Sequence, residues 1–232
     1  MTLLGLKHLR VDGLMTHFAA ADESARDGFT AEQTARFRAA CELFRACGHN
    51  PTIEDLANSA GAWAHPEARG RLVRPGGVLY GLWRDVLPPQ ADGSALRPVM
   101  SLRTRIMMLK WIAPGETLGY GRTFTAARPT HVATLPIGYA DGYPRALSNR
   151  GRVLVRRRFA PVVGRISMDL TLVDVTDVTG VAEGDIVTLI GADGPHELTA
   201  EELARTAGTI SYELTCGISQ RVRRRYSPKS KV

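Results

Sequence analysis

The first third of the chain alternates short apolar runs with segments of helical period. Apolar positions predict β-strands at residues 10–18, 53–57 and 71–73, with helical segments between them, the second at residues 61–68. Strands and helices in alternation are typical of parallel βα units. We therefore expect an α/β unit at residues 1–90.

The first helix carries the clearest periodic signal. Phe37 and Cys41 fall on one apolar face, which predicts that Cys41 is buried. Thr30 and Gln33 have the spacing of a capping box, and Gly48 follows the last periodic position. These signals predict a helix that begins at Thr30 and ends before Gly48.

Beyond residues 88–94, a predicted linker, the hydrophobic period changes to two. This change predicts a β domain at residues 91–232. Its short strands are expected at residues 132–137, 153–155, 161–164, 170–175 and 185–190. One helix interrupts them, and we expect Thr199 and Glu202 to form its capping box and Gly208 to end it.

Composition excludes several classes of protein. The three cysteines, Cys41, Cys47 and Cys216, lack a Cys-x-x-Cys spacing, which favours reduced structural thiols over disulfides or a metal site. No apolar run is long enough to cross a bilayer, and residues 1–7 lack the layout of a signal peptide. We therefore expect a cytoplasmic protein with no membrane partner.

The formal net charge of +7 is unevenly distributed. Cations cluster at residues 221–231 and at residues 156–158, where a hairpin turn is expected. Almost no aromatic residues interleave with them, and no helix suited to reading a nucleic acid is evident. We interpret the basic tail as solvated surface and expect an anionic small molecule, not a nucleic acid, as the partner.

Tyr139 lies in a turn between Gly138 and Gly142 at the end of the predicted strand 132–137. Glycines allow backbone conformations that other residues resist, so the turn can present this side chain from a fixed corner. A tyrosine held in this way serves either packing or proton transfer. The residue types alone favour packing, because tyrosines at strand ends usually bury their rings.

Three polar residues follow the predicted strands of the α/β unit. His17, Ser59 and Arg74 each lie at or just after a strand's carboxyl end. Parallel βα units carry their chemistry at these ends, so we expect the three side chains to share a site.

Taken together, these landmarks resemble the alanine racemase family of pyridoxal-phosphate enzymes, and the similarity runs through nearly the whole chain. No single string is specific, but their common order is. The matching strings are LMTHFAAAD at 14–22, ANSA at 57–60, RPG at 74–76 with LYG at 79–81, GYG at 119–121, GYADG at 138–142, GRISMD at 164–169, GTISYE at 208–213 and RVRRRY at 221–226.

The resemblance implies an α/β plus all-β fold. Residues 1–90 would be the last three βα units of a TIM-type (β/α)8 barrel that binds pyridoxal 5′-phosphate, followed by the β domain. It also implies a homodimer with shared active sites, alanine as substrate, and D-alanine supply for peptidoglycan. The activity implied is the isomerisation of L- and D-alanine by two-base proton transfer.

The resemblance also assigns catalytic roles. Tyr139 matches the base that removes the α-proton of the L-enantiomer and reaches the cofactor of the partner subunit. Phenols ionise near pH 10 and need cationic neighbours to act as bases at neutral pH. His17 and Arg74 match the residues that link this tyrosine to the pyridine nitrogen by hydrogen bonds. A permanently charged guanidinium disfavours protonation of that nitrogen and so discourages transamination.

The remaining matched residues concern binding. Ser59 and the N–H groups of Gly76 and Gly77 match the phosphate cradle, together with the hydroxyl of Tyr212. Two further matched positions lie in the substrate site. The main-chain amide of Met168 would bind the substrate carboxylate, and Asp169 lies beside it.

The departure from the family that matters is at the front of the chain, and a smaller one is at Asp55. The family's cofactor-binding lysine, in a Lys-Ala-Asn-Ala-Tyr-Gly string, does not occur here, and the similarity begins near the sixth barrel strand. Neither Lys7 nor Lys110 lies where it could take that role. Asp55 stands where the family usually has histidine, and we expect it to pair with Arg74.

We therefore expect no racemase activity from this polypeptide alone, since the proton must return on the opposite face of the carbon. The chain would be a gene fragment, an incomplete prediction, or one part of a split enzyme with a separate N-terminal half as partner. Two alternatives remain open. One is a non-catalytic dimerisation or interaction module, and the other is a racemase for a larger amino acid such as serine or lysine.

Overall fold

The computed structural model describes residues 8–227 and divides into two compact units, with the boundary between Val99 and Met100. The sequence placed this boundary near residue 90. The expectations about residues 1–7, including Lys7, and about the last basic residues, Lys229 and Lys231, lie outside the described residues. Within the described part of the chain, every helix is too short or too polar to cross a membrane.

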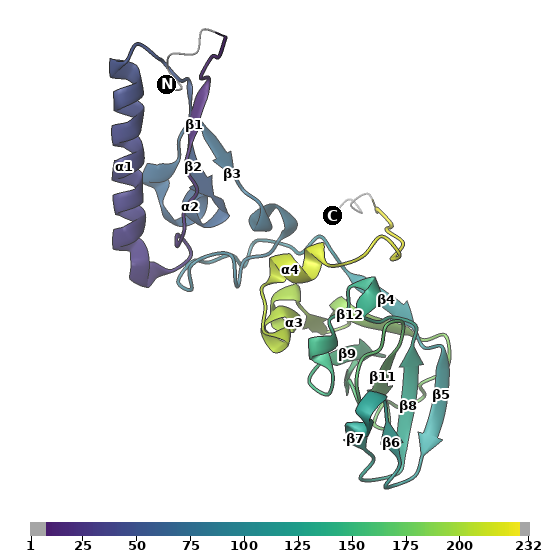
Figure 1. The fold of residues 1–232 in the computed structure, drawn as a ribbon. Helices are drawn as coiled ribbons and strands as arrows, with labels where there is room; N and C mark the ends of the chain where they lie inside the picture. The colour runs from purple at the N-terminus through teal and green to yellow at the C-terminus, as the bar shows by residue number, and fades with distance from the viewer. Residues whose placement is uncertain (1–7, 228–232) are drawn as a thin grey trace. The chain divides into compact units, whose positions relative to one another are not determined.

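The first unit is built on a three-stranded parallel sheet in the order β1-β2-β3 (Figure 1). The strands are β1 (Gly13–Met15), β2 (Ile53–Asn58) and β3 (Leu72–Arg74). β2 and β3 lie within one residue of their predicted positions, whereas β1 is three residues shorter at each end than the predicted strand. The predicted α/β unit is confirmed, and these three strands form an open sheet.

Helix α1 (Asp27–Ala46) begins earlier than predicted. Its N-cap is Arg26, and no side chain caps it, so the capping box expected from Thr30 and Gln33 is wrong. Thr30 lies inside the helix and is buried. The end was predicted correctly, because Gly48 follows the helix with a φ of 83°, a conformation that favours glycine.

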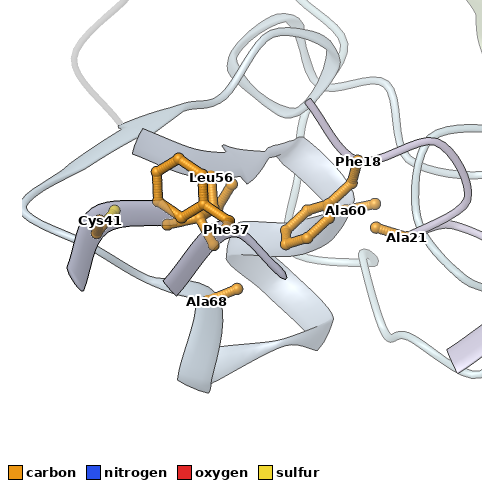
Figure 2. Packing of buried hydrophobic residues seen from close by; sticks show 8 residues of the cluster. Phe18, Ala21, Phe37, Cys41, Leu56, Ala60 and Ala68 are labelled. Carbon is orange, nitrogen blue, oxygen red and sulfur yellow. The ribbon is translucent and has the colours of Figure 1, made fainter. Parts of the chain in front are cut away.

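The core of the first unit lies between α1 and the sheet (Figure 2). Phe37 and Cys41 of α1 pack into one cluster with Phe18, Leu56 and Ala60. Cys41 is 1% exposed, as predicted. Because Phe18 is the residue after His17, its burial fixes the segment that follows β1 to the core. Truncating such a phenylalanine to alanine is expected to cost about 3–5 kcal/mol.

Short helices complete the first unit. The segment predicted as one helix at residues 61–68 is instead an α-helix followed by a 3-10 turn, and Asn58 caps the α-helix by accepting a hydrogen bond from Gly61 N at 2.9 Å. The helices are η2 (Ser24–Arg26), α2 (Ser59–Ala64), η3 (Pro66–Ala68) and η4 (Gly77–Tyr80).

The second unit is mainly β-structure, as predicted, and its described residues, 100–227, form three sheets. In the largest, the order is β10-β9-β12-β13 with β4 also paired to β12, whereas the others are β11-β8-β5 and β6-β7. The strands, shown in Figure 1, are β4 (Leu102–Arg105), β5 (Met108–Ile112), β6 (Thr117–Leu118), β7 (Phe124–Thr125), β8 (Thr130–Leu135), β9 (Arg152–Val155), β10 (Arg158–Pro161), β11 (Thr171–Asp174), β12 (Ile186–Asp193) and β13 (His196–Leu198).

One predicted strand is displaced. The sequence placed a strand at residues 161–164, but β10 ends at Pro161 and only Val162 continues, in a single bridge to Val173. The reason is the hairpin between β9 and β10, whose turn residues Arg156 and Arg157 have φ values of 49° and 64°. The tight turn brings the start of the returning strand to Arg158.

Helix α3 (Ala200–Ala207) has the predicted ends. Thr199 Oγ1 accepts a hydrogen bond from Glu202 N at 3.1 Å, and Gly208 ends the helix with a φ of 82°. The Glu202 carboxylate pairs with Arg152 of β9 instead of returning to the cap. The remaining helices are α4 (Ser211–Cys216) and the 3-10 turns η5 (Tyr120–Arg122), η6 (Tyr139–Asp141) and η7 (Arg145–Leu147).

Tyr143 is the largest fully buried side chain of the second unit, with 1% exposed. None of the described residues gives its hydroxyl a hydrogen bond. Burial without a partner favours the neutral form, so desolvation raises the pKa of the Tyr143 phenol well above its usual value.

The raised pKa of Tyr143 predicts a loss of stability at alkaline pH. In the unfolded chain this phenol ionises near pH 10, whereas in the folded chain it stays neutral, so unfolding is favoured as pH rises above about 10. Tyr143→Phe is expected to remove this component. At pH 7 it should leave stability unchanged or raise it by about 1 kcal/mol, because the orphaned hydroxyl is lost.

Thermal unfolding of both proteins between pH 7 and pH 11 measures the effect. Tyr226→Phe is the control, since Tyr226 is 90% exposed and should behave like the unmodified chain. Destabilisation by Tyr143→Phe at pH 7 of more than about 1 kcal/mol would show that the hydroxyl has a partner.

Candidate functional site

The carboxyl ends of β1, β2 and β3 lie at one edge of the sheet, because the strands are parallel. Arg74 is the last residue of β3 and reaches across to the segment after β1. Its Nη2 atom donates a hydrogen bond to the Thr16 carbonyl at 2.9 Å and lies 3.1 Å from Nδ1 of His17. Two of the three polar residues predicted at the strand ends are therefore in direct contact.

Asp55, on the central strand β2, fixes the position of the Arg74 side chain. Its carboxylate Oδ1 forms an ion pair with Arg74 Nη1, and the side chain of Asp55 is 7% exposed. A buried charge of this kind is costly unless it is paired, so the two groups stabilise each other's position. The pairing expected from the sequence is thus found.

The contacts of Arg74 fix the tautomer of His17. A guanidinium has only donors, so Nδ1 of His17 must accept the hydrogen bond from Nη2. The imidazole proton therefore lies on Nε2, where it can be donated. His17 is exposed, which leaves this N–H accessible.

Gln33 is a residue whose role the sequence did not reveal. Instead of capping α1, its side-chain amide donates to Thr16 Oγ1 at 3.0 Å and to the His17 carbonyl at 2.7 Å, and accepts from Ala19 N at 3.3 Å. One side chain thus holds the backbone on both sides of His17. The partners lie 14–17 residues away, so no local pattern could have indicated them.

Ser59 and Gly76 lie together after β2 and β3. Gly76 N–H donates to Ser59 Oγ at 2.8 Å, and Ser59 is 4% exposed. A side chain added at Gly76 would meet no protein atom within 4 Å, so the space beside this backbone is open. Gly77, the first residue of η4, is buried. The arrangement offers a hydroxyl and glycine backbone next to open space, a donor set suited to an anion.

In the second unit, Tyr139 lies on a turn that is held against the loop containing Met168. Tyr139 N–H donates to the Ser167 carbonyl and Ala140 N–H to the Met168 carbonyl, both at 3.0 Å. Asp141 closes the turn by accepting from Gly138 N at 2.9 Å. The Tyr139 side chain is 44% exposed, so the turn presents it to solvent and does not bury it.

The two glycines of this turn are needed for different reasons. Gly142 has a φ of 95°, which is the reason expected from the sequence. Gly138 has an extended backbone, with a φ of −148°. It must be glycine because an added Cβ would lie 2.3 Å from the Ser167 carbonyl oxygen and 2.4 Å from that of Met168.

Arg221 belongs to the basic tail, which the sequence suggested was solvated surface. In the structure its guanidinium donates to Asp169 Oδ1 at 2.6 Å and lies 3.4 Å from Asp141 Oδ1. The hydrogen bond to Asp169 and the charge of Asp141 raise the pKa of Arg221. This residue therefore links the Tyr139 turn to the loop with Met168 and Asp169.

The other predicted site residues of the second unit are exposed or partly exposed. Met168 is 52% exposed, and Tyr212 lies on α4 with 36% exposed. A hollow of about 400 Å³ lined by Tyr120, Arg165 and Ser167 adjoins the loop with Met168. The structure thus gathers Tyr139, Met168 and Asp169 in this unit, whereas His17, Ser59, Arg74, Gly76 and Gly77 lie in the first.

Replacing Gln33 by alanine is expected to loosen the segment around His17. Three hydrogen bonds are lost, so the unit should lose roughly 1–3 kcal/mol of stability, and the Ala19 amide should exchange faster with solvent. Hydrogen exchange followed by NMR measures this directly. Glu32→Ala, one residue earlier on α1, is the control, and equal Ala19 exchange in both variants would contradict the role assigned to Gln33.

Replacing Gly138 by alanine is expected to push the Tyr139 turn away from the Ser167–Met168 backbone. The new Cβ would overlap two carbonyl oxygens that are held by the turn itself, so we expect a destabilisation of about 3 kcal/mol in urea unfolding. Gly151→Ala is the comparison, because its closest new contact is 3.1 Å from a side-chain atom. Equal stability of the two variants would contradict the close approach at Gly138.

Comparison with known proteins shows which family this chain resembles. A sequence model described as "Alanine racemase, N-terminal domain" matches residues 1–83, and one described as "Alanine racemase, C-terminal domain" matches residues 99–226. The alanine racemase of Geobacter sulfurreducens is 50% identical over 226 residues, which cover 95% of this chain and 58% of that protein.

Solved structures give the same result. The alanine racemase of the D-cycloserine producer Streptomyces lavendulae matches with a TM-score of 0.85 and 35% identity over 95% of this chain and 57% of that chain. The alanine racemase of Bartonella henselae, with covalently bound pyridoxal phosphate, matches with a TM-score of 0.79 and 32% identity over 93% of this chain and 56% of that chain. The chain thus spans less than three fifths of the length of these relatives, and it belongs to the alanine racemase family.

Proposed function

We propose that this chain supplies one of the two proton-transferring bases of an alanine racemase, an isomerase that interconverts L- and D-alanine. The observation that carries the proposal is the exposure of Tyr139. Its side chain is 44% exposed on a braced turn, whereas Tyr143, four residues on, is 1% exposed. A tyrosine that serves packing is expected to be buried, as Tyr143 is. A phenol held at the surface of a fixed turn is suited to proton transfer.

The proposed cofactor is pyridoxal 5′-phosphate, and the donor set of the first unit fits it. Arg74 has its Nε–H left over from its contacts with Asp55, Thr16 and His17, and this donor suits the acceptor nitrogen of a pyridine ring. The anionic end suits the hydroxyl of Ser59 and the open space beside Gly76. We propose that the Tyr212 hydroxyl completes this phosphate site.

When bound, the cofactor supplies an aromatic ring that withdraws electrons from the carbon that loses its proton. Arg74 keeps a permanent positive charge next to the ring nitrogen, which disfavours protonation there and so limits transamination. His17 donates its Nε2–H, because its Nδ1 atom accepts a hydrogen bond from Arg74. We propose that this donor stabilises the phenolate of Tyr139 from the partner subunit of a head-to-tail homodimer.

The finer features of the proposal follow the family. The three parallel strands would be the last three βα units of a (β/α)8 barrel, and the remaining units would come from another segment or a separate N-terminal half. The Met168 main-chain amide would bind the substrate carboxylate, with Asp169 beside it. The product would be D-alanine for peptidoglycan, made in the cytoplasm.

We expect the purified chain with pyridoxal phosphate to have no racemase activity, because the sequence lacks the family's lysine string. Mixing it with the part of the Geobacter sulfurreducens enzyme that precedes the matched region is expected to restore activity. Conversion of L- to D-alanine, followed by chiral chromatography, is the measurement. Tyr139→Phe should lower kcat of the mixture at least about 100-fold, since it removes a general base.

Tyr226→Phe is the matched control and should keep the restored activity, because Tyr226 is exposed and lies outside the proposed site. Turnover by the pure chain would refute the need for a second base. Association of the two parts without activity would favour a non-catalytic interaction module. Restored activity on serine or lysine but not alanine would favour a racemase of a larger amino acid.

A further inference from the structure

Asp55 makes two contacts that join the three strand ends. Its backbone carbonyl accepts a hydrogen bond from Thr16 N at 3.0 Å, and its carboxylate pairs with Arg74. The backbone pairing is fixed as well, because Asp55 lies opposite Met15 of β1 and Leu72 of β3. A single residue of the central strand thus holds both the segment with His17 and the end of β3.

The donors of Arg74 are divided in a specific way. Both N–H groups of Nη2 are used, by the Thr16 carbonyl and by His17 Nδ1, and Nη1 faces Asp55. What remains for a ligand is Nε–H, because Nη1 is buried against Asp55. If the guanidinium rotated, Nη2 would leave His17, so the tautomer of His17 depends on what holds the other side of Arg74.

We propose that Asp55 is a positioning residue that acts through Arg74. Its carboxylate orients the guanidinium so that Nη2 keeps His17 in the Nε2–H tautomer and the remaining Nε–H faces an incoming aromatic nitrogen. The first part of this proposal stands on the contacts of the first unit alone. The second part rests on the proposed function, because it requires a pyridine-type ligand.

The choice of a carboxylate has a physical reason. The Arg74 side chain is only 27% exposed, and a guanidinium in such a place needs a counter-charge. A neutral acceptor at position 55 would hold it less strongly, because it carries no opposite charge to attract the guanidinium. Without the carboxylate, we expect Arg74 to turn toward solvent and release His17.

The test compares Asp55→Asn with Glu54→Gln by NMR of the ligand-free chain. Glu54 is the preceding residue of β2 and pairs with Arg45, so its variant also loses a carboxylate–arginine pair but leaves Arg74 untouched. Long-range ¹H–¹⁵N spectra report the tautomer of each histidine, with His17 assigned from the signals missing in His17→Phe. We expect Asp55→Asn to lose the fixed Nε2–H signature of His17 and Glu54→Gln to keep it.

An unchanged His17 spectrum in a folded Asp55→Asn variant would overturn the proposal. If Asp55→Asn does not fold, Asp55→Glu replaces it, since this variant keeps the charge but moves the oxygens by one methylene. It should perturb His17 in the same direction to a smaller extent. No perturbation of His17 in that variant would equally count against the role of Asp55.

A second measurement separates this proposal from the proposed function. The probe is 4′-deoxypyridoxine 5′-phosphate, which has the ring nitrogen and phosphate but no aldehyde that could react with a lysine. In the unmodified chain it should shift the Arg74 Nε–H signal and the amides of Gly76 and Gly77. In Asp55→Asn the amide shifts should persist and the Arg74 shift should be lost.

The outcomes differ in what they reject. No response of the unmodified chain, with His17 altered in Asp55→Asn, would reject the ligand and keep Asp55 as the residue that positions His17. Equal Arg74 responses in the unmodified chain and in Asp55→Asn would reject the orientation of the guanidinium by Asp55.

Discussion

The ion pair between Asp55 and Arg74 is the interaction on which the site of the first unit depends. It joins the middle of the parallel sheet to the end of a neighbouring strand, and Arg74 carries the connection on to His17. A charge at the end of a three-residue strand would otherwise be free to turn into solvent. The buried carboxylate makes one orientation of the guanidinium the favourable one.

The second unit fixes its turn mainly through its backbone. The Tyr139 turn is fixed by close approach of backbones, which only glycine at position 138 permits, and by hydrogen bonds from successive amides to the Ser167 and Met168 carbonyls. Arg221 adds an exposed link on the outside. Both units therefore present polar side chains from segments whose backbones are held on two sides.

Local signals in the sequence predicted much of this structure. Periodicity identified the three parallel strands and the burial of Cys41, and capping residues identified the ends of α3, because each depends on residues a few positions apart. Similarity to a family indicated the pairing of Asp55 with Arg74. What could not be predicted depends on distant partners. Gln33 matched a capping box, yet its amide is used by the segment after β1. Arg221 looked like part of a solvated tail because its partner Asp169 is 52 residues away.

The central claim is that the strand ends of the first unit form one preorganised site, with Arg74 at the ring nitrogen and Ser59 at the phosphate of a vitamin B6 cofactor. A crystal structure of the chain grown with pyridoxal 5′-phosphate tests it most directly. The account predicts the cofactor between these two residues, with the Asp55–Arg74 pair intact. Binding elsewhere on the chain, or an Arg74 side chain turned away from Asp55 and His17, would contradict it.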